Sequence, residues 1–168
     1  EAMDGPINFG ERDKWWGLLV EGFHEPLYGM NYNPPYYKSL FEQYGFKPFY
    51  DQICMGMDLR KKLSDRIYQR HALVANESDF SARHIQKNDL KTYASHFAEV
   101  YNKAWAGHGG MKEISSEQVL LMFNQMKPVM DERIIWFAYH KEEPIGFFVN
   151  IPDLNQWFQY LNGKFDLL

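Results

Sequence analysis

Apolar residues recur at intervals of three or four between residues 88 and 105, which is the spacing of one face of an α-helix. Asn88 can cap this predicted helix, and a glycine-rich segment, 107–110, follows its end. A second helix is predicted from Ser115, because Gln118 stands three residues later and completes a capping box. The two helices are expected to follow each other directly along the chain.

Two apolar runs, 133–139 and 144–151, flank the polar tetrapeptide 140–143. Short apolar runs on both sides of a polar turn are typical of a β-hairpin. A further strand is predicted at 82–86, and a short helix is predicted at 154–161, directly after a capping aspartate. The second half of the chain therefore reads as strand, two helices, hairpin and helix.

The first half of the chain has a weaker periodicity. Residues 36–44 are predicted to form a short helix, because a proline precedes them and a glycine follows. Residues 15–23 and 46–59 are rich in apolar residues and are predicted to be strands, and 61–76 a charged helix. Together these elements predict a mixed α/β fold, with helices packed on a largely antiparallel sheet. The best position for a boundary follows residue 76.

Composition and charge exclude several classes of protein. With 168 residues, 45% hydrophobic and 24% charged, the chain has the composition of a folded protein. A formal net charge of −4 gives no positive field for phosphate backbones, so no nucleic-acid partner is expected. Aromatic residues make up 17% of the chain. A dense core and an aromatic-lined ligand pocket both explain this content.

The cysteine and histidine residues of the sequence predict neither a metal site nor a disulfide within the chain. Cys54 is the single cysteine, which excludes a disulfide within the chain and a four-cysteine zinc site. No two histidines have the spacing of a metal-binding pair on a helix, so no metal is expected. The first residues are acidic, unlike a signal peptide, and no apolar run reaches the ~20 residues that span a bilayer. We therefore expect a cytoplasmic location and no membrane partner.

The order of strand, two helices and hairpin resembles the beginning of the GNAT acyltransferase fold, and residues 134–149 resemble its second and third strands. The run Leu-Phe-Glu at 40–42, followed by Gly-Phe at 45–46, is similar to the closing helix and strand of a GNAT module. GPINF, LLVEGF and IPDLNQ together resemble a bacterial group that carries two GNAT-like modules in tandem. The resemblance implies that residues 1–76 are the C-terminal half of one module and 77–168 the N-terminal half of a second.

The resemblance also implies a chemistry, namely transfer of an acyl group from acetyl-CoA or a related thioester to a small-molecule or peptide amine. Many GNAT enzymes use the tyrosine of a Leu-Tyr-Glu motif to protonate the leaving thiolate. This chain has Phe41 at that position, and a phenyl ring has no proton to give. The neighbouring Tyr37 and Tyr44 are the catalytic candidates that remain.

GNAT enzymes bind the CoA pyrophosphate on backbone N–H groups of a Gln/Arg-x-x-Gly-x-Gly/Ala turn between a strand and a helix. The segment 107–110 is the glycine-rich candidate here, but it follows a helix and has Ala104 at the Gln/Arg position. The cofactor-binding residues are therefore left unassigned. We expect a chain that is incomplete as an acyl-CoA-binding module.

The substrate-binding candidates gather where the helix of residues 88–105 ends, the region that lines the acceptor pocket in GNAT modules. Asn155 is added because capping by the preceding aspartate leaves it without a structural task. Core packing is the alternative for the aromatic candidates, and solvation is the alternative for the histidine. The candidates are Tyr101, Trp105, Gly107, His108 and Asn155.

Two functions stay open at this point. The first is a GNAT-like acyl-CoA-dependent N-acyltransferase module whose acceptor is unknown. The second is a non-catalytic, structural or ligand-binding GNAT module, which the phenylalanine at position 41 fits.

Overall fold

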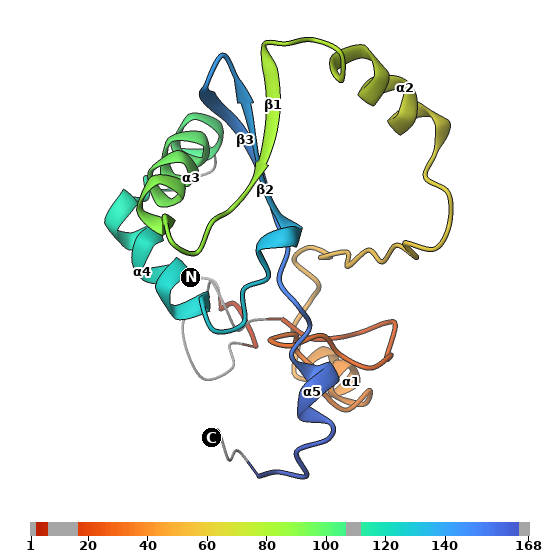
Figure 1. Ribbon diagram of the computed structural model, residues 1–168. Helices are drawn as coiled ribbons and strands as arrows, with labels where there is room; N and C mark the ends of the chain where they lie inside the picture. Colours follow the sequence, from red (N-terminus) through yellow and green to blue (C-terminus); the bar gives the residue numbers. More distant parts are fainter. Residues whose placement is uncertain (1–2, 7–16, 107–111, 165–168) are drawn as a thin grey trace. The chain divides into compact units, whose positions relative to one another are not determined.

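The computed structural model describes residues 3–6, 17–106 and 112–164, which belong to two compact units. One unit is Asp58–Pro152, and the other combines Glu1–Met57 with Asp153–Leu168. The mixed α/β fold predicted from the sequence is confirmed, with a sheet and packed helices in Asp58–Pro152 (Figure 1). The assignment of residues 1–76 and 77–168 to halves of two GNAT-like modules remains a prediction.

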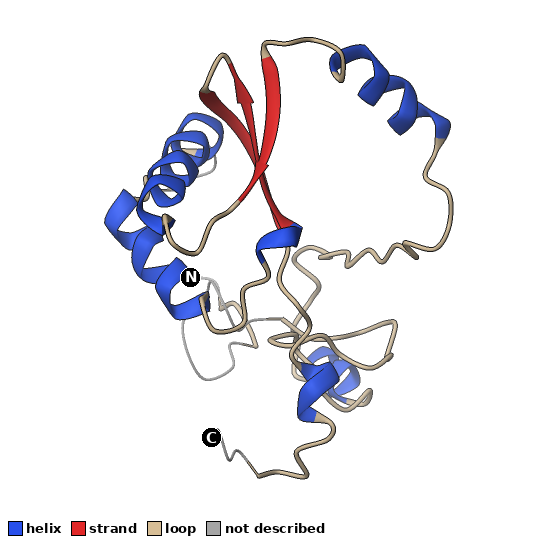
Figure 2. Ribbon diagram, in the orientation of Figure 1, coloured by secondary structure: helices blue, strands red, loops and turns tan. Residues whose placement is uncertain are grey.

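The sheet has three antiparallel strands in the order β1 (Phe80–His84), β2 (Ile135–His140) and β3 (Glu143–Val149) (Figure 2). Strand β2 is hydrogen-bonded on both sides, and its extended backbone places successive side chains on opposite faces of the sheet. Phe137 is fully buried, whereas its neighbour Trp136 is 37% exposed. One face of the sheet therefore carries the core.

Helices α3 (Leu90–Trp105) and α4 (Ser116–Met126) supply the other wall of that core. The Phe97 ring on α3 stacks on Phe147 of β3 with 4.2 Å between centroids, and it meets the buried Phe123 of α4 at 5.8 Å. Edge and stacked contacts of this kind add to the free energy that apolar burial already contributes. The apolar residues that recur at helical spacing in the sequence thus form the face of α3 that packs on the sheet.

The hairpin predicted for residues 134–149 is present, but its turn is tighter than the tetrapeptide suggested. His140 pairs with Glu143, so Lys141 and Glu142 alone form the turn. Their φ angles are 48° and 67°, which is the left-handed backbone of a type I′ turn. This turn matches the right-handed twist of the strands that it joins.

Other elements of this unit agree with the sequence to within a few residues. The capping box of Ser115 and Gln118 at the start of α4 is confirmed. Strand β1 begins two residues earlier than predicted, and Asp89 takes the cap position of α3 in place of Asn88. The predicted charged helix is shorter, as α2 (Asp65–Val74), and a 3₁₀ turn, η1 (Glu132–Ile134), leads into β2.

The second unit contains α1 (Tyr37–Gln43) and α5 (Asn155–Phe158), and its described residues form no strand. The strands predicted at 15–23 and 46–59 are therefore wrong over the residues that the structure describes. A strand is stable only where a neighbour pairs its N–H and C=O groups and an apolar layer covers it. Ile53 and Met55, which are 77% and 92% exposed, have no such cover.

Hydrogen bonds from polar side chains to the backbone replace a sheet ladder in this unit. The Asn33 side chain accepts from the Leu19 N–H at 2.8 Å and donates to the Leu19 C=O at 3.2 Å. The Asp153 carboxylate accepts from the Tyr28 N–H at 3.0 Å, and the Tyr28 ring meets Phe158 edge-on. Residues far apart in the sequence are thereby joined without a strand.

We predict that Lys141→Asn stabilises the hairpin, because asparagine adopts positive φ more readily than lysine does. The free energy of unfolding is expected to rise by about 0.5–1 kcal/mol in urea denaturation. Lys141→Gln is the matched control, since it also removes the ion pair with Asp79 but has no such backbone preference. Equal stability of the two variants would contradict the turn assignment.

Candidate functional site

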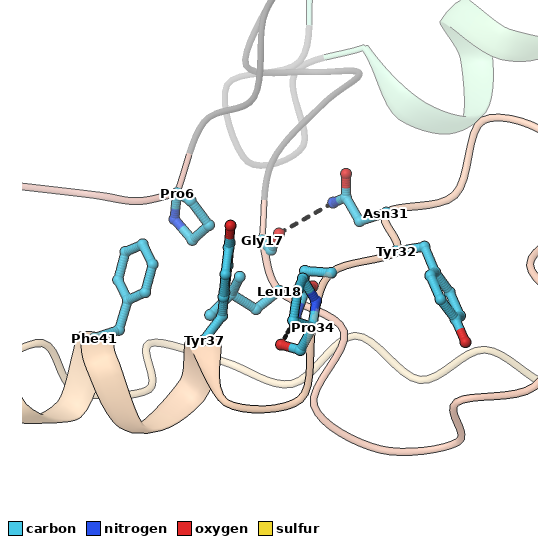
Figure 3. A pocket seen from close by; sticks show the side chains of 9 residues that line it. Pro6, Gly17, Leu18, Asn31, Tyr32, Pro34, Tyr37 and Phe41 are labelled. Atoms are coloured by element: carbon cyan, nitrogen blue, oxygen red, sulfur yellow. Dashed lines mark hydrogen bonds between the residues drawn. The ribbon is translucent and has the colours of Figure 1, made fainter.

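A hollow of ≈ 270 Å³ lies in the unit that contains α1. Tyr37 and Phe41 stand one helical turn apart, so both project from the same side of α1 toward Pro6 (Figure 3). The described residues that line it are Pro6, Gly17, Leu18, Asn31, Tyr32, Asn33, Pro34, Tyr37 and Phe41. It is an apolar surface with few polar side chains, which is the usual character of a small-molecule site.

Two of the polar side chains in this wall form hydrogen bonds with backbone groups. Asn33 is held by Leu19, as described above, and the Asn31 amide donates to the Gly17 C=O at 3.2 Å. The hydroxyl of Tyr37 has no hydrogen-bond partner within residues 3–6, 17–106 and 112–164. Tyr37, which projects from α1 toward Pro6, is therefore one side chain of this hollow that can give a proton to a ligand.

Tyr44, the other catalytic candidate, does not line the hollow. Helix α1 ends at Gln43, and the chain turns at Gly45 with a φ of 102°. The Tyr44 ring therefore stacks on Phe46, with an interplanar angle of 22°, and is 84% exposed. A proton donor in such a position would be surrounded by water.

The aromatic candidates at the end of α3 have different environments. Tyr101 is half-buried and its ring stacks on Phe97 at 6.0 Å. Trp105 is the last residue of α3 and is 51% exposed, so it is not wholly in the core. Gly107 and His108 lie outside the described residues. A pocket walled by these four residues stays a prediction.

Asn155 has a structural task that the sequence did not reveal. Its side-chain amide donates to the Pro26 C=O at 2.7 Å, and its backbone N–H donates to the Asp153 carboxylate at 3.2 Å. Asn155 and Tyr37 belong to one unit, whereas Tyr101 and Trp105 belong to the other. A role of Asn155 in substrate binding stays a prediction.

A polar cluster on the helical side of the sheet was missed by sequence reasoning. The Tyr139 hydroxyl lies 3.0 Å from Nδ1 of His96, and the Arg83 guanidinium lies 4.7 Å from the centre of the Tyr139 ring. Burial raises the pKa of Tyr139 and of its neighbour Tyr93, and the hydrogen bond to the Glu142 carboxylate raises the pKa of Arg83. The sequence signal that could have found this cluster is the alternation of side chains along β2, which places Tyr139 on the buried face of the sheet. A buried phenol requires a hydrogen-bond partner.

The described residues hold no group of three or more histidine, cysteine or acidic side chains that could bind a metal ion. No helix among them is long and apolar enough to cross a membrane.

No family model and no solved structure matches the sequence. Among curated proteins, a bacterial ceramide synthase from Caulobacter vibrioides is 26% identical over 161 residues, covering 95% of this chain and 41% of that protein. Protein YghO from Escherichia coli is 26% identical over 157 residues, covering 88% of this chain and 38% of that protein. The chain thus spans about two fifths of the length of these relatives.

We predict that Trp105→Ala has little effect on folding, because half of the side chain is already in water. The free energy of unfolding is expected to fall by less than about 1 kcal/mol. Phe123→Ala is the comparison, since that fully buried ring should cost about 3–5 kcal/mol. Thermal and urea denaturation measure both. A loss at Trp105 as large as that at Phe123 would show that Trp105 is part of the core.

Proposed function

We propose that this chain is a GNAT-like module of an acyl-CoA-dependent N-acyltransferase. The observation that carries the proposal is the match along 95% of the chain to a protein named bacterial ceramide synthase. Ceramides are amides of a fatty acid and a long-chain amino alcohol, so their formation by acyl transfer is an N-acylation. The resemblance of the strand, the two helices and the hairpin to a GNAT module supports the same reaction class.

The proposed reaction requires that the amine and the thioester be held together and that one proton be delivered to the leaving thiolate. The amine nitrogen attacks the thioester carbonyl carbon, forming the C–N bond. The carbon–sulfur bond then breaks, the nitrogen loses a proton, and the thiolate takes one up. Orienting the two substrates in a water-poor site is the main catalytic contribution in such a direct transfer. Tyr37, in the hollow beside α1, is our candidate for the group that protonates the thiolate.

A long-chain amino alcohol is the first acceptor to test, since the name of the relative points to one. The acyl donor is proposed to be an acyl-CoA, with acetyl-CoA as the simplest member.

A non-catalytic module is the second candidate function. Phe41 stands where GNAT enzymes often have the acidic tyrosine, and its ring packs on Phe46 at 5.2 Å. A phenyl ring in that position serves packing and cannot transfer a proton. This candidate predicts a ligand-binding or structural protein without turnover.

We predict that the polypeptide containing this chain converts an acyl-CoA and a long-chain amine into an amide and free CoA, detected by mass spectrometry. Tyr37→Phe is expected to lower kcat about a hundredfold, since general acid catalysis contributes on that order. Tyr44→Phe is the matched control and should keep normal turnover. Equal rates for both variants would remove Tyr37 from the mechanism, and no amide with any acyl-CoA would favour the non-catalytic candidate.

A separate prediction concerns this chain by itself. Because its one glycine-rich segment lacks the pyrophosphate-binding pattern, it should bind acetyl-CoA weakly or undetectably in calorimetric titration. Micromolar affinity, about −8 kcal/mol, would show that the CoA-binding residues lie within this chain.

A further inference from the structure

The hollow beside α1 is bounded by chain segments that hydrogen bonds join to one another. The Gly17 N–H donates to the Pro6 C=O at 2.9 Å, and the Asn31 side chain donates to the Gly17 C=O at 3.2 Å. Asn33 holds both backbone groups of Leu19, at 2.8 and 3.2 Å. The shape of the hollow is therefore set by specific bonds within its own wall.

These bonds also pair the polar groups of the wall with each other. The Pro34 C=O accepts from the Asn33 side chain and from the Tyr37 N–H, each at 3.1 Å. Among the described residues that line the hollow, none is charged. A phosphate, carboxylate or ammonium group would lose its hydration there without meeting an opposite charge. The wall therefore favours an apolar, uncharged ligand.

The apolar part of the wall comes from three half-buried side chains, those of Pro6, Leu18 and Phe41 (Figure 3). The volume of ≈ 270 Å³ gives room for roughly ten carbon atoms, because an apolar cavity of about 150 Å³ accepts benzene, which has six. The size of the hollow thus sets an upper limit on the apolar group that it can cover.

We propose that this hollow binds a straight hydrocarbon chain, up to a limit of about ten carbon atoms. The inference rests on the proposed function, whose acyl donor and long-chain amine both carry such a chain. Each methylene that leaves water for an apolar wall raises the affinity, about fourfold if its burial is complete. Methylenes beyond the limit stay in water and add nothing. The hollow in this way selects substrates by chain length.

Binding is tested with neutral straight-chain alcohols, from butanol to hexadecanol, in calorimetric titration of the polypeptide that contains this chain. The dissociation constant is expected to fall about two- to fourfold with each methylene as far as about decanol, and to stay constant for longer alcohols. Absence of binding, or an affinity that keeps rising at the same rate to hexadecanol, would overturn the proposal.

Two variants of the wall should move the limit in opposite directions. A phenylalanine side chain has about three more carbon atoms than leucine, so Leu18→Phe should lower the limit to about seven carbons and Phe41→Leu should raise it to about thirteen. Leu27→Phe is the matched control, since it makes the same change in the same unit at a side chain that is 60% exposed and does not line the hollow.

Leu27→Phe should keep the limit of the wild type. Circular dichroism shows whether each variant is folded, and if Leu18→Phe is not, Phe41→Leu alone decides. The same limit in the wild type and in every folded variant would show that the alcohols bind elsewhere.

Steady-state kinetics on the same polypeptide distinguish the two sources of the chain. The value of kcat/KM is measured for acyl-CoAs of increasing length with one amine, and for amines of increasing length with one acyl-CoA. A break near ten carbons that Leu18→Phe moves to shorter chains assigns the hollow to the acyl chain if it occurs in the first series. In the second series, the same break assigns the hollow to the amine.

The hydrocarbon site and the proposed function fail in distinguishable ways. If no combination of substrates gives an amide, the proposed function fails, and the alcohol titrations still decide whether the hollow binds a hydrocarbon chain. If the amide forms but neither series shows a break, the proposed function stands and the hollow is not a substrate site.

Discussion

The pairing of β2 with a strand on each side is the constraint from which the Asp58–Pro152 unit is built. Pairing with β1 and β3 holds β2 in the plane of the sheet, and its extended backbone places successive side chains on the helical face and the opposite face. Phe137 reaches Tyr93 at 5.0 Å on the helical face, whereas Trp136 on the other face lies against His84. A register shift of one residue would exchange the two faces and destroy the core. The tight turn after His140 holds this register.

The same register creates the polar cluster. Tyr139 is the last inward position of β2, so its ring is packed like a core residue while its hydroxyl reaches the margin where α3 carries His96. Arg83 lies over the Tyr139 ring and meets Glu142 in the turn, which closes that margin with opposite charges. Hydrogen bonds at the edge of a core have few alternative geometries, because the surrounding side chains are close-packed.

The unit that contains α1 is organised differently. Side-chain amides and carboxylates bind backbone groups far away in the sequence, as Asn33 does with Leu19 and Asn155 with Pro26. Many large apolar side chains remain exposed in this unit, including Phe49 at 81% and Met55 at 92%. Its hollow therefore lies in a framework held by individual hydrogen bonds. Tyr37 projects into it from α1.

The sequence by itself determined the elements whose stability is local. The capping box at Ser115, the helical face of α3 and the polar hairpin turn all depend on residues within a few positions of each other, so their patterns could be recognised. Strands depend on partners, and the apolar run at 46–59 had the composition of a strand but pairs with no other segment of the described chain. Only the tertiary structure brought His96 to Tyr139, 43 residues away, because that contact follows from the register of β2 and the packing of α3 on it.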